Sequence, residues 1–296
     1  MRSEAAALTQ SHARARDFVA LAKPRLNLLV VASTLVGYAM APGESLGLLH
    51  VCGLLLGTGF VAGGASAFNQ VLERDVDALM RRTRLRPLPD QRLQPTEGVL
   101  FGGAISVAGL VLIAAASNLL AAAVALATLL SYVVVYTPLK RRSSFSTVIG
   151  AIPGALPPII GWAAVEGALP AEPWVLFGIM FLWQLPHFLA IAWMYREDYA
   201  RAGFPMLPVL EPDGRSTGRQ AVVYAAALVP LSLAPTPLRM TGDIYFAGAL
   251  ILGAAFLWLT IGFARSRSVA DARRVFFASI VYLPVLWVLM ILNKIS

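Results

Sequence analysis

The sequence predicts an all-α membrane protein, a polytopic bundle of nine transmembrane helices with a cytoplasmic N-terminus. Three observations support this prediction. The 296 residues are 58% hydrophobic and only 14% charged, with a mean hydropathy of +0.70, which is too apolar for a soluble globule. Apolar segments of about 20 residues, the length that crosses a bilayer, recur along the whole chain. Almost all basic residues lie in alternate connections between these segments.

The nine predicted spans cover most of the chain. The count of nine rather than eight depends on Ser117 and Asn118, where two apolar runs meet almost without a loop. A single helix of about 40 residues there would be twice as long as the bilayer is thick. We treat residues 1–296 as one integral-membrane domain with a cytoplasmic tail at 1–22. The expected spans lie at about residues 26–41, 48–68, 98–117, 119–137, 147–165, 173–194, 220–238, 244–263 and 275–293.

Basic residues set the predicted orientation. The N-terminal tail holds five lysines and arginines, and the connections after the second, fourth, sixth and eighth spans hold six, three, four and four. Of the 24 basic residues, only Arg239 and Lys294 fall on the other side. Because basic residues collect in cytoplasmic loops, we expect the N-terminus inside and the C-terminus outside. The net charge of +8 is then a topology signal and does not indicate a nucleic-acid partner.

Three polar segments interrupt the apolar chain, and all three fall on the predicted cytoplasmic side. "FNQVLERDVDALMRRTRLRPL" (68–88) continues the second span, "YTPLKRRSS" (136–144) follows the fourth, and "WMYREDYARAGFPMLPVLEPDGR" (193–215) continues the sixth. If the second and sixth spans pack together, their acidic residues face one cavity at the membrane surface. This surface is therefore the predicted site of chemistry.

The first segment presents oxygen atoms on one helical face. Asn69, Glu73 and Asp77 fall within an arc of about 80°, whereas Asp75 points away. Such a ladder suits a hard divalent cation, and we expect it to bind Mg²⁺. Arginine side chains suit phosphate oxygens, so the surrounding arginines indicate a diphosphate bridged through the metal. The alternative is that they are membrane anchors paired with the acids. The arginines in question are Arg74, Arg81, Arg82, Arg84 and Arg86.

The other two polar segments supply further candidates. Asp198 is a candidate ligand of a second metal ion, and Tyr195 and Arg201 lie near it as candidate substrate-binding residues. Lys140, two residues after Pro138, is able to reach the same phosphates as a point charge. Its alternative interpretation is a lysine that reaches from the membrane edge to the surface.

Polar side chains inside a span are costly and therefore functional candidates. The sixth span contains Gln184 and His187, which are three residues apart and are expected to share a face. They are candidates for binding the second substrate. The alternative is a buried histidine that bonds to Gln184 or to a backbone carbonyl.

The first polar segment resembles the first aspartate-rich motif, NDxxDxxxD, of the UbiA family of intramembrane prenyltransferases. Asn69, Gln70, Glu73 and Asp77 occupy its four polar positions. The stretches "RDVDALMRRTRLRPL", "YTPLKRRS", "GAIPGALPPIIGW", "WQLPHFLAIAW" and "YREDYARAGFPMLPV" are similar to the haem-farnesylating branch of that family. Together with "AKPR" (22–25), the resemblance covers nearly the whole chain. Gln70 and Glu73 depart from the family's aspartates, and Ala202 stands where many relatives have a second-motif aspartate.

The resemblance implies a UbiA-type bundle and a Mg²⁺-dependent reaction. Farnesyl diphosphate would ionise to an allylic cation, a vinyl group of haem b would capture it, and water would complete haem O for haem-copper oxidases. Haem b is then a substrate and not a permanent cofactor. Asp77, Asp198 and Lys140 become candidate catalytic residues, and His187 becomes a candidate iron ligand or orienting group.

Partners and location follow from the same resemblance. The expected partners are farnesyl diphosphate, haem b, membrane lipid and a downstream haem A synthase, with no nucleic acid. The expected location is the cell inner membrane, with the active site facing the cytoplasm. Two alternatives stay open: a UbiA-type enzyme acting on an aromatic acceptor for quinone synthesis, and an ion-coupled transporter. Acidic residues at one surface, away from the membrane midplane, disfavour the transporter.

Overall fold

The structure is a computed structural model that describes residues 14–44 and 46–295. Within these residues every regular element is a helix, apart from one isolated bridge between Thr241 and Lys294. The all-α prediction is confirmed. After a first helix, Arg14–Ala22, the chain forms α2 (Pro24–Met40), α3 (Leu48–Asp77), α4 (Pro95–Ala116), α5 (Leu119–Leu130), the π-helix η1 (Ser131–Tyr136), α6 (Thr137–Leu139), α7 (Ser146–Ala155), α8 (Pro157–Glu166), α9 (Ala171–Met194), α10 (Arg196–Arg201), α11 (Leu207–Leu210), α12 (Arg215–Leu233), α13 (Asp243–Ser266) and α14 (Val269–Leu292).

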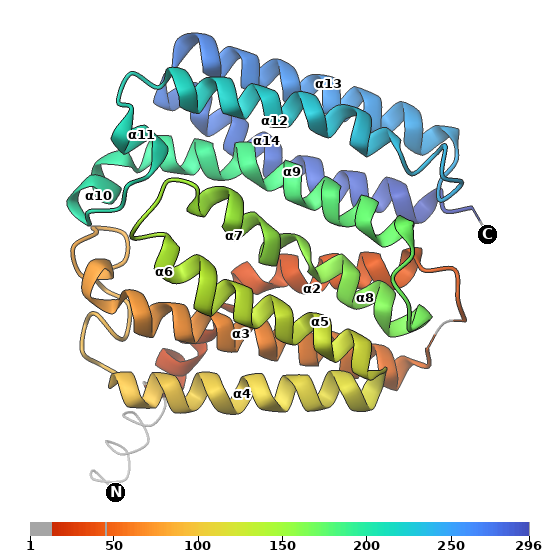
Figure 1. Ribbon diagram of the computed structural model, residues 1–296, viewed down its shortest axis with the longest axis horizontal. Coiled ribbons are helices and arrows are strands. Elements are labelled where there is room, and N and C mark those ends of the chain that lie inside the picture. Colours follow the sequence, from red (N-terminus) through yellow and green to blue (C-terminus); the bar gives the residue numbers. More distant parts are fainter. Residues whose placement is uncertain (1–13, 45, 296) are drawn as a thin grey trace, which may run out of the picture.

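Each predicted span corresponds to a helical part of the bundle, but not every one is apolar enough to count as a membrane span. Among the described residues, seven helices are long and apolar enough, and α2 makes an eighth if it is combined with the first helix, which bends from it by 42°. α12 is not among them, because its first turns carry Arg215, Arg219 and Gln220. It nevertheless packs between α9 and α13 (Figure 1).

Two helix breaks occur where the local chemistry requires them. α4 ends at Ala116 and α5 begins at Leu119, and the Asn118 side chain caps α5 by accepting from Ala121 N at 2.9 Å. The predicted break at 117–118 is therefore confirmed. The fifth predicted span divides into α7 and α8 before Pro157, because proline has no N–H to continue the helical hydrogen bonds.

Small residues allow neighbouring helices to approach closely. A Cβ atom on Gly37 of α2 would lie 1.9 Å from the carbonyl oxygen of Pro158 in α8, and one on Gly161 would lie 1.9 Å from that of Thr34. Within a membrane such contacts take the place of a hydrophobic driving force between helices. The α2–α8 contact therefore depends on the absence of side chains at both positions.

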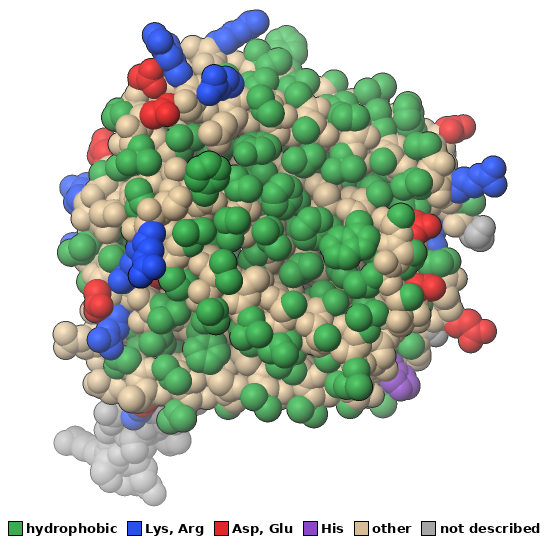
Figure 2. All heavy atoms as spheres, viewed as in Figure 1, with side chains coloured by type: hydrophobic (Ala, Val, Ile, Leu, Met, Phe, Trp, Pro, Cys, Tyr) green, Lys and Arg blue, Asp and Glu red, His purple; other side chains and the backbone are tan. Residues whose placement is uncertain are grey.

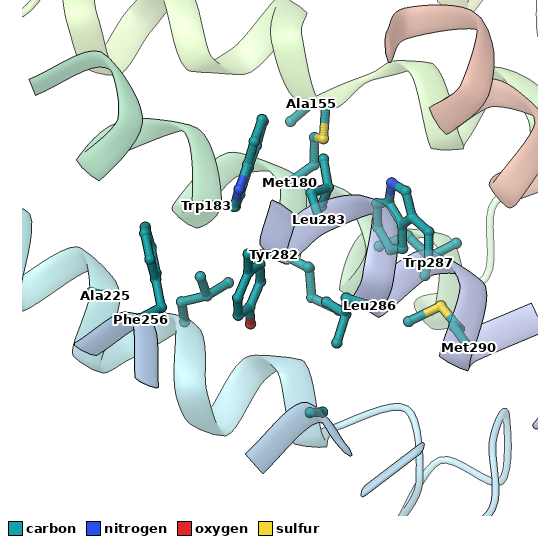
Figure 3. Close-up of a cluster of buried hydrophobic side chains, with 14 of the residues drawn as sticks. Ala155, Met180, Trp183, Ala225, Phe256, Tyr282, Leu283, Leu286, Trp287 and Met290 are labelled. Atoms are coloured by element: carbon teal, nitrogen blue, oxygen red, sulfur yellow. The ribbon is translucent and has the colours of Figure 1, made fainter. Parts of the chain in front are cut away.

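The largest apolar core joins α9, α12, α13 and α14. Figure 3 shows Trp183 of α9, Phe256 of α13 and Tyr282 and Trp287 of α14 directed into the same cluster. Tyr282 also exchanges a 2.8 Å hydrogen bond with Ser232 of α12. This packing fixes the position of α9, the helix that leads into the third polar segment.

The three polar segments lie at one end of the bundle. The loop after α3, the end of α6, and α10 with α11 meet on the left of Figure 1. Figure 2 shows an apolar middle band with charged side chains along its margins. The functional candidates therefore gather where the helices end.

Candidate active site at one end of the bundle

The candidate site begins on the last turns of α3. Asn69, Glu73 and Asp77 follow one another at four-residue spacing and lie on one buried face, each at most 4% exposed. Asp75 is exposed and pairs with Arg74 at 3.2 Å. The structure thus places Asp75 away from the buried ladder, as the helical geometry predicts.

Each ladder carboxylate has one cationic partner from another segment. Glu73 Oε2 accepts a hydrogen bond from Lys140 Nζ at 3.0 Å, and Asp77 Oδ2 accepts one from Arg86 Nη1 at 2.7 Å. Lys140 follows α6, and Arg86 lies in the loop after α3. These pairs tie three chain segments together at the ladder.

Among the residues that the structure describes, the second oxygen of each carboxylate has no hydrogen-bond partner. Glu73 Oε1 and Asp77 Oδ1 are buried without a hydrogen bond, which is costly for a charged group. A hard cation prefers such oxygen ligands, so the residues present fit one. No group of three or more His, Cys, Asp or Glu side chains arranged to hold a metal occurs in residues 14–44 and 46–295. A cation here would therefore need further ligands, from Asn69 or from a substrate.

Positive charge surrounds the ladder. Burial lowers the pKa of Lys23 to about 7, and Arg86 acts in the same direction while Asp77 opposes both. Burial also acts to lower the pKa of Lys140, but the Glu73 carboxylate and its hydrogen bond outweigh it, so that pKa lies above its ordinary value. Lys140 is therefore charged at neutral pH, and the site is suited to an anionic ligand.

The third polar segment packs against the end of α3. Val76 and Met80 belong to one apolar cluster with Tyr199 and Phe204. The Lys140 ammonium lies 4.7 Å from the centre of the Phe204 ring. The continuations of the second and sixth predicted spans therefore pack together at this end, and all three polar segments meet there.

Asp198 and its neighbours are placed on this segment but are engaged locally. The Asp198 carboxylate, on α10, accepts a hydrogen bond from Arg201, three residues later. Tyr195, at the junction of α9 and α10, lies under the Arg82 guanidinium, 5.1 Å from it. No hydrogen bond or ion pair joins Asp198 to Asn69, Glu73 or Asp77.

The arginines predicted to bind phosphate lie in different places and do not form one cluster. Within the described chain, Arg86 is the one arginine that contacts the ladder. Arg74 is occupied by Asp75, and Arg81 is exposed at the surface. Arg82 lines a separate hollow beside Tyr195.

No hydrogen bond joins Gln184 and His187. Gln184 is buried, and its Nε2 donates to the carbonyl oxygens of Ala151 at 2.9 Å and Met180 at 3.1 Å. His187 Nδ1 lies 2.7 Å from Ser279 Oγ on α14. The two side chains therefore bond to different neighbouring helices, α7 and α14, although they are close in sequence.

An apolar cavity of about 140 Å³ lies next to the ladder, inside the bundle. Ser66, one turn before Asn69 and Gln70, is part of its wall, and Gly154 lines it where the Gln184 amide packs. The cavity is formed by α2, α3, α5, η1, α7 and α8 and is lined by Asn27, Val30, Thr58, Val61, Ala62, Ala65, Ser66, Thr128, Leu129, Tyr132, Pro153, Gly154, Pro157 and Ile160.

Several site residues were missed by sequence reasoning. Lys23 lies beside the ladder, and Thr137 Oγ1 accepts a 3.3 Å hydrogen bond from Asn69 Nδ2. Asn27 and Tyr132 line the cavity. The rule that a polar residue inside a span is functional would have selected Asn27. Lys23 enters the sequence reasoning only as a basic residue of the tail and as part of the "AKPR" stretch.

Gln70, although it occupies a motif position, has a structural contact. Its Nε2 donates to the carbonyl oxygens of Leu21 at 2.8 Å and Ser66 at 3.1 Å. It therefore joins the first helix to α3 rather than facing the ladder.

Comparisons with known proteins agree with this geometry. The model of the UbiA prenyltransferase family matches residues 30–281. A protein of Solibacter usitatus named protoheme IX farnesyltransferase is 48% identical over 288 residues, covering 94% of this chain and 99% of that protein.

Solved structures share the fold at low identity. A digeranylgeranylglyceryl phosphate synthase structure superposes with a TM-score of 0.78 at 17% identity, covering 94% of this chain and 97% of that one. A UbiA homologue from Archaeoglobus fulgidus, solved bound to GPP and Mg²⁺, gives a TM-score of 0.66 at 20% identity, covering 93% and 99%.

Proposed function

The chain belongs to the UbiA prenyltransferase family, and from this membership we propose that it transfers the farnesyl group of farnesyl diphosphate to a vinyl group of haem b. Water addition completes the product, haem O. The observation that carries this proposal is the end-to-end similarity to a protoheme IX farnesyltransferase at 48% identity. It favours haem over an aromatic acceptor.

The ladder and its cations form the diphosphate side of the proposed site. Glu73 and Asp77 would hold Mg²⁺ through their unpartnered oxygens, with Asn69 as a further ligand. When bound, Mg²⁺ supplies positive charge that offsets the charge of the leaving diphosphate. Lys140 and Arg86 already contact the two carboxylates, so their side chains are positioned to bind the phosphate oxygens directly.

The third polar segment, together with Arg81 of the first, completes the diphosphate side of the proposed site. We assign Asp198 to a second metal position and Arg201 and Arg81 to the outer phosphate oxygens. Arg201 is bonded to Asp198, and both lie on α10, which packs beside the end of α3. Arg74 would join them only by leaving Asp75.

The apolar cavity next to the ladder suits the farnesyl chain. Its wall is largely aliphatic and contains a few polar groups, among them Asn27 and Tyr132. A dry wall delays capture of the allylic cation by water until the vinyl carbon has reacted. Gln184, which packs against the cavity-lining Gly154, would limit the depth to which the chain enters.

The acceptor side of the proposed site includes His187. Ser279 Oγ is 2.6 Å from the carbonyl oxygen of Phe276 and donates to it, so it accepts from His187 Nδ1–H. The lone pair of the imidazole is then on Nε2, the form in which histidine binds iron. We propose His187 as the residue that ligates or orients the haem iron.

The membrane arrangement is part of the proposal. We place nine helices across the cell inner membrane, counting α2 and α12, with the N-terminus and the active site on the cytoplasmic side. The distribution of 22 of 24 basic residues supports that orientation. A downstream haem A synthase is the expected acceptor of the product.

One reaction tests the proposed function. Purified protein is incubated with haem b, farnesyl diphosphate and Mg²⁺, with 4-hydroxybenzoate as a competing acceptor, and the products are identified by mass. We expect haem O and no prenylated benzoate. Prenylated benzoate without haem O would contradict the proposal.

A further inference from the structure

A second hollow, of about 260 Å³, lies at the same end of the bundle but outside the ladder. It is formed by the end of α9, the start of α14 and the loop after α3. It is lined by Arg82, Ile191, Met194, Tyr195, Val269, Arg273, Phe276 and Phe277. Two arginines and an apolar, partly aromatic wall thus line the same hollow.

The two arginines lack acidic partners. In the described part of the chain neither Arg82 nor Arg273 forms an ion pair with a carboxylate, whereas the adjacent Arg274 binds Asp271 at 2.7 Å. The Arg82 guanidinium instead lies over the Tyr195 ring at 5.1 Å. Both arginines are exposed at the hollow and are available to an anion from outside.

The wall of this hollow leads to His187. Phe276, which lines it, stacks on the His187 ring with 5.0 Å between the ring centres. Ile191 and Tyr195 follow His187 by one and two turns of α9, so Tyr195 is about 12 Å along the helix axis from it. The hollow therefore lies beyond His187, toward the end of α9.

We propose that this hollow binds the propionate-bearing edge of haem b, with Arg82 and Arg273 each pairing with one carboxylate. The inference rests on the proposed function and assigns the acceptor its own recognition site, separate from the diphosphate site. Two cations match two carboxylates, and aromatic side chains suit the porphyrin face. Arg82 accordingly serves the acceptor and not the diphosphate.

The test measures haem binding by absorption titration of the full-length protein in nanodiscs. The ligands are haem b and its dimethyl ester, in which both carboxylates are masked. Wild type should bind haem b about tenfold more tightly than the ester, a factor typical of a charged hydrogen bond. Arg273→Gln should weaken haem b binding by about the same factor and abolish the preference for free carboxylates.

Arg274→Gln is the matched control, because it removes the same charge from the neighbouring position but does not line the hollow. It should keep both the affinity and the preference. Equal behaviour of the two variants, or equal affinity of wild type for haem b and its ester, would overturn the proposal.

The test of this haem-binding site can fail or succeed independently of the test of the proposed function. Farnesyl diphosphate binding by Arg273→Gln, measured by calorimetry, should equal that of wild type. If wild type binds haem b with the carboxylate preference but forms no haem O, the proposed function fails while the binding site stands.

Discussion

Glu73 and Asp77 are both buried at the end of an apolar bundle. In the described part of the chain, only one oxygen of each carboxylate has a hydrogen-bond partner. A buried carboxylate that lacks a partner is costly unless another charge binds there. Because Lys140 and Arg86 bind the other two oxygens, the free oxygens stay directed to the site. At the residue scale, the chemistry therefore depends on this incomplete pairing.

Replacing Lys140 by methionine should weaken farnesyl diphosphate binding by tenfold or more. The change removes a charge that contacts Glu73 and leaves that carboxylate buried without a partner. Calorimetric titration in Mg²⁺ measures the effect. Arg142→Met, an exposed change two residues away, should bind like wild type. Equal binding by both variants would remove Lys140 from the site.

Replacing His187 by alanine should impair haem use while sparing farnesyl diphosphate. The imidazole bonds to Ser279 and stacks on Phe276, so its loss alters the acceptor side alone. The KM for haem b should rise, and the affinity for farnesyl diphosphate should not change. Unchanged kinetics with haem b would leave His187 as a packing residue.

Sequence reasoning located the ladder because four-residue spacing is a property of one helix. It did not locate Lys23 or Thr137, because their positions beside α3 are set by packing between segments far apart in the chain. For the same reason it grouped Gln184 with His187, although each bonds to a different helix.

At the element scale, α3 combines a membrane span with the site. Its 30 residues form one unbroken helix from Leu48 to Asp77, so the ladder is held rigidly at the end of the span. α2 and α8 pack closely against each other at Gly37 and Gly161. Their contact positions α2, and Lys23 stands directly before it at the N-cap position.

Gly161→Val should destabilise the bundle. Its Cβ would lie 1.9 Å from the backbone oxygen of Thr34, and backbone cannot move aside as a side chain can. Overpacking of this kind costs about 1–3 kcal/mol, which thermal unfolding in detergent should show as a lowered midpoint. Gly262→Val, with nothing within 4 Å of the added Cβ, should change stability little. Equal midpoints would show that α2 and α8 adjust freely.

The helix boundaries show how far apolar length alone is informative. It located the break at Asn118, the start of α3 and the extent of α9, but it ended the second span at residue 68, whereas α3 continues to Asp77. It placed the seventh span at 220–238, whereas α12 covers Arg215–Leu233, because helical hydrogen bonding continues into the polar residues before the apolar run. An apolar run indicates which part of a helix lies within the membrane, but it does not indicate where the helix begins and ends.

At the scale of the whole molecule, the basic residues predict one orientation. A membrane-impermeant thiol reagent should label a cysteine placed at Arg142 only after the cells are permeabilised, so that the reagent reaches the cytoplasmic side. A cysteine at Arg239 should be labelled from outside, since both positions are exposed. Cys52 is replaced first, because it is itself exposed. Labelling with the reverse sidedness would invert the orientation and place the active site outside.

The most direct measurement compares Asp77→Asn with Asp75→Asn in a single turnover with haem b, farnesyl diphosphate and Mg²⁺, following haem O by mass. Both changes neutralise one acid of the same segment, but Asp77 is buried in the ladder and Asp75 is exposed on the other face. We expect Asp77→Asn to lose haem O formation by at least about a hundredfold, consistent with the loss of transition-state charge stabilisation, and Asp75→Asn to match wild type. Equal rates for the two variants, with both proteins inserted and monodisperse, would contradict the assignment of the ladder as the site of farnesyl transfer.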